Sequence, residues 1–279
     1  MIEQNTVRKK ISKTIVFILL LIVAFAMAVP FIWMLSSSFK FDKEIFAYPI
    51  AWIPEVFRWS NYAEVWTRIA FPTYYLNTLK LAVIITVGQL FTCSLAAYSF
   101  SKLHYPGRDK LFLAYIATLM IPWHATMIPQ FIVIKNLGLY GSHWALIVMQ
   151  VFSPFGVFIL RQFMLGIPIE INQSARIDGC SEFGIYWRMI LPLSKPGLAT
   201  LTVFTFNFVW NDYLAPMIYL EDDVLKTIQL GLVSFKSTYS MEYGLIMAGT
   251  VSSLIPIILI YIFAQKYLIE GVTFSGLKG

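Results

Sequence analysis

Residues 166–196 read GIPIEINQSARIDGCSEFGIYWRMILPLSKP, and they form the most informative stretch of the chain. Pro168 suits the first turn of a helix, and Gly179 suits the left-handed residue that ends one. Ser181 can cap a second helix, which is expected to end before Pro192. The pattern predicts two short helices joined at a glycine, and therefore a compact, ordered projection.

Apolar runs flank this stretch and recur along the whole chain, each near the roughly 20 residues that cross a bilayer. We predict six spans, at 14–35, 77–100, 111–134, 144–165, 197–220 and 244–266. The composition agrees, because 58% of the 279 residues are hydrophobic and only 13% are charged, against about 25% charged residues in soluble domains. The sequence predicts an all-α integral membrane protein with six transmembrane helices.

Basic residues predict the orientation of these spans. Lys and Arg number 13 on the side of the two termini and 8 on the opposite side, which accounts for all 21. The excess places both termini in the cytoplasm by the positive-inside rule. The expected order is a cytoplasmic tail at 1–13, the first span, an extracytoplasmic loop at 36–76, a core of five spans at 77–266 and a cytoplasmic tail at 267–279. The first span is too long for a signal peptide and lacks a cleavage site, so we expect it to be retained.

Several classes of function find no support in the sequence. Cys93 and Cys180 cannot form a disulfide framework, and the three histidines lack the spacing of metal ligands. No GxxxxGK[ST] or GxGxxG phosphate-binding motif occurs, so we expect no nucleotide, metal or other cofactor on this chain. The net charge of +6 lies in short segments between apolar runs, which argues against a nucleic-acid partner.

The stretch 166–196 resembles the EAA loop of permeases in binding-protein-dependent ATP-binding-cassette (ABC) importers. That pattern is Glu-Ala-Ala, three residues, Gly, nine residues, Ile, one residue and Leu-Pro. The corresponding residues here are Gln173, Ser174, Ala175, Gly179, Met189, Leu191 and Pro192, with Asp178 before the glycine. The spacing is complete, but Gln173 lacks the carboxylate with which the family could form an ion pair with its ATPase.

Other segments from about residue 75 onward are similar to sugar permeases of the maltose permease type. They are Tyr75-Leu76-Asn77-Thr78, Ala96-Ala97-Tyr98-Ser99-Phe100, Trp210-Asn211-Asp212 and the glycine-rich end of the chain. The resemblance implies a type I ABC importer permease in a bacterial plasma membrane. Such a subunit is not an enzyme, and forms a sugar pathway with a second permease. An extracytoplasmic solute-binding protein delivers the sugar, and a separate cytoplasmic ATPase dimer binds ATP and Mg²⁺.

The resemblance also implies which residues couple the chain to that ATPase. In the loop they are Gln173, Ser174, Ala175, Asp178, Gly179, Phe183, Trp187 and Pro192. The small Ser174 and Ala175 are expected to let a partner approach closely. Phe183, Trp187 and Met189 are expected to be buried, either against the ATPase or against the chain's own spans. In the tail, Gly276, Leu277, Lys278 and Gly279 either reach the ATPase dimer or form a frayed end.

Polar residues within the predicted spans are candidates for the solute pathway, because such residues are costly in a bilayer. They are Trp123, His124, Gln130, Gln150, Ser153, Asn207, Trp210, Asn211 and Asp212. Amides beside aromatic rings suit the hydroxyls and apolar faces of a sugar. The alternative for Asp212 is an interfacial carboxylate bonded to local backbone, and for the others a polar bridge between helices.

Three further alternatives remain open. The solute could be an amino acid, a peptide or a compound of the glycerol-phosphate type, since the EAA loop is shared across importers. An ion-driven secondary transporter would need charged residues in mid-span or an inverted repeat, and a membrane enzyme would need paired carboxylates or histidines at one depth.

The prolines within the spans indicate either packing kinks or breaks around a pathway. The aromatic loop 36–76 is either an interfacial segment or a docking surface for an external partner.

Overall fold

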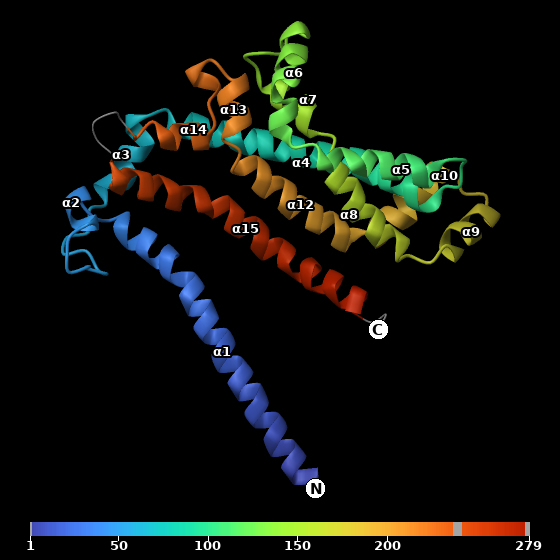
Figure 1. The fold of residues 1–279 in the computed structure, drawn as a ribbon, viewed down its shortest axis with the longest axis horizontal. Helices are drawn as coiled ribbons and strands as arrows, with labels where there is room; N and C mark the ends of the chain where they lie inside the picture. Colours follow the sequence, from blue (N-terminus) through green and yellow to red (C-terminus); the bar gives the residue numbers. More distant parts are fainter. Residues whose placement is uncertain (1, 237–241, 277–279) are drawn as a thin grey trace. The chain divides into compact units, whose positions relative to one another are not determined.

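The computed structural model describes residues 2–236 and 242–276, with side chains at 12–236 and 242–267, and is mainly helical (Figure 1). Within these residues, four helices are long and apolar enough to cross a membrane: Ser12–Ser37, Phe71–Lys102, His143–Leu165 and Tyr243–Tyr267. Two bent pairs raise the number to six if each is one span: Arg108–Met120 with Trp123–Asn136, and Glu182–Leu193 with Lys195–Trp210. The predicted all-α membrane fold is confirmed.

The long helices are joined by short helical pieces (Figure 1). The first half contains α1 (Ile2–Ser37), α2 (Asp42–Ile45), α3 (Ser60–Arg68), α4 (Phe71–Lys102), α5 (Arg108–Ala117), η1 (Thr118–Met120) and α6 (Trp123–Asn136). The middle contains α7 (His143–Gln150), α8 (Pro154–Leu165), α9 (Glu170–Ile177), α10 (Glu182–Ile185), η2 (Tyr186–Ile190) and α11 (Leu191–Leu193). The last part contains α12 (Lys195–Trp210), α13 (Leu214–Tyr219), η3 (Asp223–Leu225), α14 (Ile228–Val233) and α15 (Tyr243–Gly276).

The predicted third span is bent sharply between its two halves. The segments Arg108–Met120 and Trp123–Asn136 meet at an angle of 98°. Ile121 adopts an extended conformation directly before Pro122, as the proline ring requires of its predecessor. Pro122 is therefore a true break, whereas Pro129 lies inside α6 and leaves that helix continuous.

The predicted fourth and fifth spans are also broken. Residues 151–153 separate α7 from α8, and residues 211–213 separate α12 from α13. Pro154 occupies the first turn of α8, where Ser153 caps the helix by accepting a hydrogen bond from the Gly156 N–H at 3.1 Å. The first break lies directly before Pro154, where the sequence indicates a kink or a break, whereas the second precedes Pro216 by several residues.

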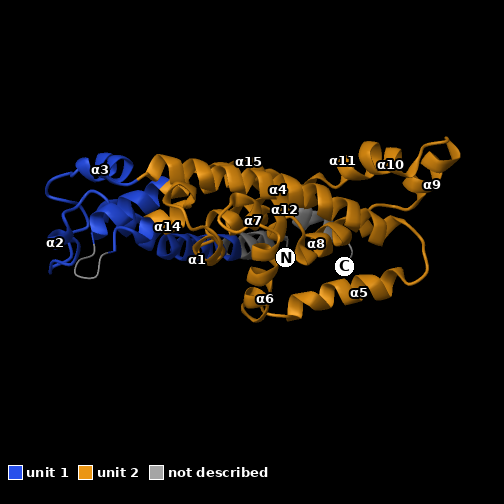
Figure 2. Ribbon diagram, turned by 90° about the horizontal axis from the view of Figure 1, so that it is seen from above, with its two compact units in different colours: residues 1–69, 232–252 blue, residues 70–231, 253–279 orange. Residues whose placement is uncertain are grey.

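The chain divides into two compact units, coloured separately in Figure 2. The N-terminal unit contains Met1–Ile69 and Leu232–Ser252, and the core unit contains Ala70–Gly231 and Ser253–Gly279.

In the N-terminal unit, α1 is suited to contact with lipid. Its most apolar window is 0% buried, and residues such as Phe17 and Met27 are more than half exposed. The following loop is held by aromatic contacts, in which the Phe39 ring lies 4.7 Å from Trp59 and 5.1 Å from Tyr62. The loop contains the two short helices α2 and α3.

In the core unit, α4 packs against both α8 and α12 (Figure 1). The buried residues of this packing include Cys93 and Ala97 on α4, Leu160 on α8 and Leu201 on α12. Close approach depends on Gly156, because a Cβ atom there would lie 2.9 Å from the Cys93 sulfur and 3.1 Å from a Leu201 methyl carbon. The small residue thus sets the spacing of the three helices.

We expect Gly156→Leu to destabilise the core unit, because a large side chain cannot fit between α4 and α12. Overpacking of this kind costs about 1–3 kcal/mol. Thermal unfolding of the purified protein in detergent would show a lower midpoint for Gly156→Leu than for Ala114→Leu, a control at an exposed position on α5. Equal midpoints for the two variants would contradict the packing described here.

Candidate coupling loop and polar pathway

The segment 166–196 is ordered, and its first helix ends as the sequence predicts. Gly179 has a φ of +79°. Its N–H donates to the Arg176 carbonyl at 3.0 Å, and the Cys180 N–H donates to the Ala175 carbonyl at 2.9 Å. These two bonds form a Schellman motif, which requires a left-handed residue at the position of Gly179. The motif fixes the turn between the two helices of the loop.

The second helix is longer than predicted. Ser181 caps it by accepting a hydrogen bond from the Gly184 N–H at 3.2 Å, and α10, η2 and α11 then follow without a gap up to Leu193. Pro192 therefore does not end the helix. The preceding turn, Tyr186–Ile190, is a π-helix, a local adjustment that commonly accompanies a disturbed hydrogen-bond ladder.

One face of the loop packs inward against α4 and α8. Ala175, Ile185, Tyr186 and Ile190 are each at most 1% exposed and belong to the same buried cluster as Leu160. The small size of Ala175 therefore serves packing within this chain. The expected close approach of a partner at Ala175 is wrong, because the chain's own core already covers it.

The opposite face of the loop is open. Gln173, Ser174 and Asp178 are exposed. Phe183 and Trp187 are 62% and 53% exposed, and their rings stack at 6.3 Å with an interplanar angle of 14°. An exposed stacked pair of this kind is available to a partner.

Met189, in contrast, packs against the buried cluster. The expected burial against the chain's own spans thus applies to Met189 and not to Phe183 or Trp187. Figures 1 and 2 both show α9 and α10 beyond the same end of the core helices, where a partner could reach them.

Three side chains of α4 form hydrogen bonds with the loop. The Ser94 hydroxyl lies 2.8 Å from that of Tyr186, the Tyr98 hydroxyl donates to Glu182 at 2.7 Å, and the Lys102 ammonium donates to the Ile167 carbonyl at 2.5 Å. These α4 residues are at most 5% exposed. They are spaced four residues apart and so lie on one face of the helix.

Glu182 also joins the two helices of the loop to each other. Its second carboxylate oxygen accepts a hydrogen bond from the Arg176 guanidinium at 2.5 Å. This bond is the main cause that lowers the pKa of Glu182, with a smaller contribution from Tyr98. The carboxylate therefore stays ionised at neutral pH, and it links α9, α10 and α4.

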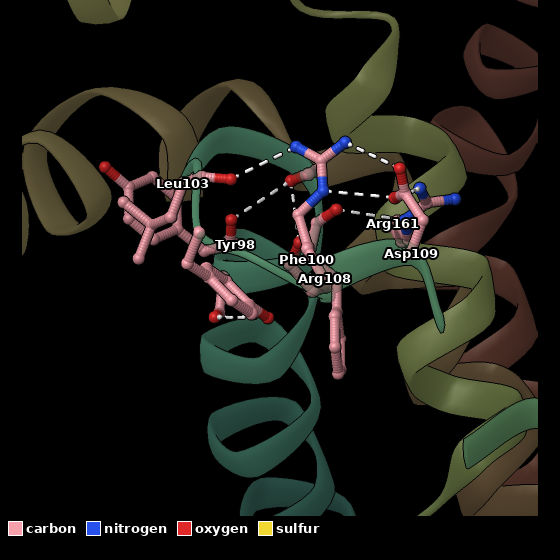
Figure 3. A network of polar contacts seen from close by, with 10 residues as sticks. Tyr98, Phe100, Leu103, Arg108, Asp109 and Arg161 are labelled. Carbon is pink, nitrogen blue, oxygen red and sulfur yellow. Dashed lines mark hydrogen bonds and ion pairs between the residues drawn. The ribbon is translucent and has the colours of Figure 1, made fainter. Parts of the chain in front are cut away.

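A second polar network secures the turn between α4 and α5 at the same end of the core unit (Figure 3). Asp109 accepts hydrogen bonds from Arg108 at 3.1 Å and from Arg161 on α8 at 3.3 Å. Arg161 also donates to the Phe100 carbonyl at 3.1 Å, and its guanidinium lies 4.1 Å from the centre of the Phe112 ring. The network joins α4, α5 and α8.

The sequence analysis missed the three α4 ties. The available signal was the spacing of Ser94, Tyr98 and Lys102, three polar residues at intervals of four near the end of an apolar span. A polar stripe on one face of such a helix indicates contact with a polar neighbour. It does not identify the loop as that neighbour, because the contacts join residues between 65 and 92 positions apart.

The breaks at 151–153 and 211–213 meet at a polar cluster, which contains Asp212 and Gln150. The Gln150 amide donates to Asp212 at 2.9 Å, and Asp212 also accepts a hydrogen bond from the Ala215 N–H at 3.2 Å. Asp212 bonds local backbone, as the alternative interpretation of this residue proposes, and it also bridges two helices. The side-chain amide oxygen (Oε1) of Gln150 is buried and has no hydrogen-bond partner among the described residues.

Two of the predicted pathway residues have structural roles. Trp210 is 0% exposed, stacks on Phe206 at 5.3 Å and donates to the Ser253 carbonyl at 2.9 Å. It cannot line an open pathway as expected, because packing covers its whole surface. Ser153 caps α8, as described above.

The remaining candidates fall into two groups. On α6, Trp123 donates to Gln130 at 3.0 Å and packs edge-on against His124 at 5.6 Å, so Trp123 contacts both of the other candidates. Asn207 on α12 and Asn211, the residue that directly follows this helix, are exposed and joined by a hydrogen bond of 3.0 Å.

Two exposed aromatic residues share the α12 face with these asparagines. Phe204 and Phe208 are 53% and 63% exposed. With Asn207 and Asn211 they follow the spacing i, i+3, i+4 and i+7, which places all four on one side of a helix. We call this set the α12 face.

Two expectations concern the tail and metal ions. Gly276 is the last residue of α15, whereas Leu277, Lys278 and Gly279 lie outside the described residues. The described residues contain no group of three or more His, Cys, Asp or Glu side chains that could hold a metal ion.

The membrane-spanning helices and the ordered loop between two of them define a multi-span transport subunit of the permease class. The family described as "Binding-protein-dependent transport system inner membrane component" matches residues 94–273. The chain belongs to this family, which confirms the resemblance seen in the EAA-like loop.

Relatives and a solved structure agree with this assignment. The chain is 32% identical over 260 residues to the arabinooligosaccharides transport system permease protein AraQ of Halalkalibacterium halodurans, covering 92% of this chain and 93% of AraQ. It is 30% identical over 267 residues to the lactose transport system permease protein LacG of Rhizobium radiobacter, covering 96% and 97%. It also matches a chain of a bacterial ABC transporter involved in the import of the acidic polysaccharide alginate, with a TM-score of 0.81, 26% identity and coverage of 93% and 97%.

We expect Gly179→Ala to weaken the coupling loop, because an L side chain in a left-handed conformation costs about 1–2 kcal/mol. The change should increase protease cleavage within 166–196 relative to the unaltered chain. Gly179→Asn is the matched control, since asparagine tolerates this conformation, and it should be cleaved less than Gly179→Ala. Equal cleavage of both variants and the unaltered chain would show that the turn does not depend on this residue.

Proposed function

We propose that this chain is a transmembrane subunit of an ABC importer for a mono- or oligosaccharide. It forms the pathway with a second, homologous permease and receives the sugar from an extracytoplasmic binding protein. A separate cytoplasmic ATPase dimer binds ATP and Mg²⁺ and drives transport through the loop 166–196. Both termini lie in the cytoplasm of a bacterial cell, and the chain itself carries no cofactor.

The exposed stacked pair of Phe183 and Trp187 is the observation that carries this proposal. Large aromatic residues are the usual anchors of protein interfaces, and here they lie on a loop whose other face is fixed to α4 and α8. A partner that binds the exposed face of the loop can therefore move the core unit as a rigid body. With Gln173 in the acidic position, binding at this face relies on apolar contact more than on charge.

The α12 face supports a sugar as the solute. Asn207 and Asn211 are polar groups exposed on a spanning helix, and an amide that faces lipid lacks hydrogen-bond partners. This face is therefore expected to line a polar space or to meet the second permease. Amides flanked by the rings of Phe204 and Phe208 suit sugar hydroxyls and sugar ring faces. The relatives named for arabinooligosaccharides and lactose support the same solute class.

We expect Phe183→Ala and Trp187→Ala to weaken binding of the ATPase. Loss of an aromatic anchor typically costs about 2 kcal/mol, so co-purification of the ATPase with this chain should fall sharply. The control is Leu113→Ala on α5, which removes a side chain that is 70% exposed away from the loop. Solute uptake by this chain alone, without any ATPase, would contradict the proposal and favour a secondary transporter.

We expect Asn207→Ala to reduce sugar uptake by the assembled transporter about fivefold, the effect of losing roughly 1 kcal/mol from one hydrogen bond. ATPase binding should not change, because residue 207 lies outside the loop. Phe263→Ala on α15, which is 73% exposed, is the control for a general effect of surface changes. Uptake measured across mono- and oligosaccharides, amino acids, peptides and glycerol phosphate identifies the solute class, and a non-sugar as the only solute would contradict the sugar assignment.

A further inference from the structure

Helix α4 contacts both of the functional regions of the core unit, although it is adjacent to neither in sequence. Near its end, Ser94, Tyr98 and Lys102 bond the loop 166–196, as described above. Other α4 side chains, Gln89 and Thr92, lie five and two residues before Ser94 and bond the break between α7 and α8. From Gln89 to Lys102 the helix spans about 20 Å at 1.5 Å per residue. The contacts with the two regions thus extend over about that length of α4.

At the break, α4 satisfies carbonyl groups in the interrupted segment. The Gln89 amide donates to the Gln150 carbonyl at 2.6 Å, and the Thr92 hydroxyl donates to the Val151 carbonyl at 2.6 Å. Gln89 also accepts a hydrogen bond from Thr205 on α12 at 2.7 Å. These bonds hold the residues next to Asp212, because Gln150 donates to Asp212 through its side chain.

At the loop, the contact through Tyr98 is the most specific. The Tyr98 hydroxyl donates to Glu182 at 2.7 Å and accepts a hydrogen bond from the buried Asn172 amide at 3.4 Å. Glu182 in turn bonds Arg176, so one α4 hydroxyl is connected to both helices of the loop. The Tyr98 ring also packs edge-on against Tyr186 at 5.5 Å.

The other neighbours of the loop differ from α4 in how they are attached. Helix α8 leads into the loop at Gly166, and α12 begins directly after it at Lys195, so the backbone joins both of them to the loop. Helix α4 is attached through side chains alone. Single substitutions can therefore release α4 from the loop while the chain stays continuous.

We propose that α4 transmits displacement of the loop 166–196 to the polar cluster of Gln150 and Asp212, with Tyr98 as the positioning residue at the loop end. The inference rests on the proposed function, in which an ATPase moves the loop. The four linked elements are α9, α10, α4 and the α7–α8 break. A helix with its hydrogen bonds intact is stiff enough to carry motion between two ends that are each held by buried polar contacts.

The test uses Tyr98→Phe in the complete transporter, reconstituted in liposomes with its second permease, ATPase and binding protein. The change removes one hydroxyl and keeps the ring packing against Tyr186. We expect sugar uptake per ATP hydrolysed to fall about tenfold, the factor available from loss of one hydrogen bond to a charged group, while ATP hydrolysis continues. Tyr115→Phe is the matched control, because that residue packs against the same buried cluster and its hydroxyl makes none of these contacts.

A second measurement distinguishes a loss of transmission from the loop to the polar cluster from a loss of protein stability. A cysteine introduced as Leu214→Cys, an exposed position two residues after Asp212, reports the state of the cluster through its rate of thiol modification. ATP should change this rate in the otherwise unaltered transporter and in Tyr115→Phe, and should change it much less in Tyr98→Phe. Glu182→Gln should reproduce the effect, and the double variant should be no worse than either single one if both act through the same bond.

Loop contact with the ATPase is monitored in the same samples by cross-linking through Ile177→Cys, which is 86% exposed. Cross-linking that persists in Tyr98→Phe together with an unchanged ATP response at residue 214 would overturn the role of α4 and leave the proposed function intact. Failure to cross-link even with tyrosine at position 98 would count against the proposed function itself. If Tyr98→Phe does not assemble, Glu182→Gln serves as the test variant with the same expectations.

Discussion

A backbone carbonyl inside a bilayer must find its hydrogen bond within the protein, because no water is available to supply one. Most of the core unit meets this requirement through helical bonds, but residues 151–153 and 211–213 interrupt two helices. Side chains of α4 donate to carbonyl groups at the first break, and the carboxylate of Asp212 accepts a hydrogen bond from the Ala215 N–H at the second. The architecture around the breaks follows from this requirement, since α4 must run alongside α8 and α12 for its side chains to reach them.

The loop 166–196 meets a different requirement. One of its faces is fixed to the core helices, and the opposite face is exposed. Its inner face is held by apolar packing and by buried polar contacts to α4. Its outer face presents the rings of Phe183 and Trp187. The inner contacts combine apolar packing with hydrogen bonds, so the loop is attached to the core helices while its outer face remains exposed.

The sequence predicted the membrane fold and the loop because both depend on local patterns. Long apolar runs define the spans, and the pair of Gly179 and Ser181 defines the turn and cap of the loop. The helix breaks were only partly predictable. Pro122 and Pro154 coincide with breaks, whereas Pro129 and Pro256 lie inside continuous helices, and nothing in the local sequence distinguishes these cases.

Burial and long-range pairing could not be read from the sequence. Ala175 and Trp210 belong to recognisable motifs, yet each is buried in the chain's own core. The bonds from Gln150 to Asp212 and from Tyr98 to Glu182 join residues 62 and 84 positions apart. Such pairs depend on how the helices pack, which single-residue patterns do not specify.

The left-handed glycine of the loop has a consequence for how transporters of this kind can diversify. The angle between α9 and α10 is set by backbone bonds at Gly179 and by side chains that face inward. The outward-facing side chains, including Gln173, do not contribute to this angle. Geometry and surface chemistry are therefore encoded by separate residues, so substitutions of the outer residues can change which partner surface fits the loop without changing the turn between its two helices.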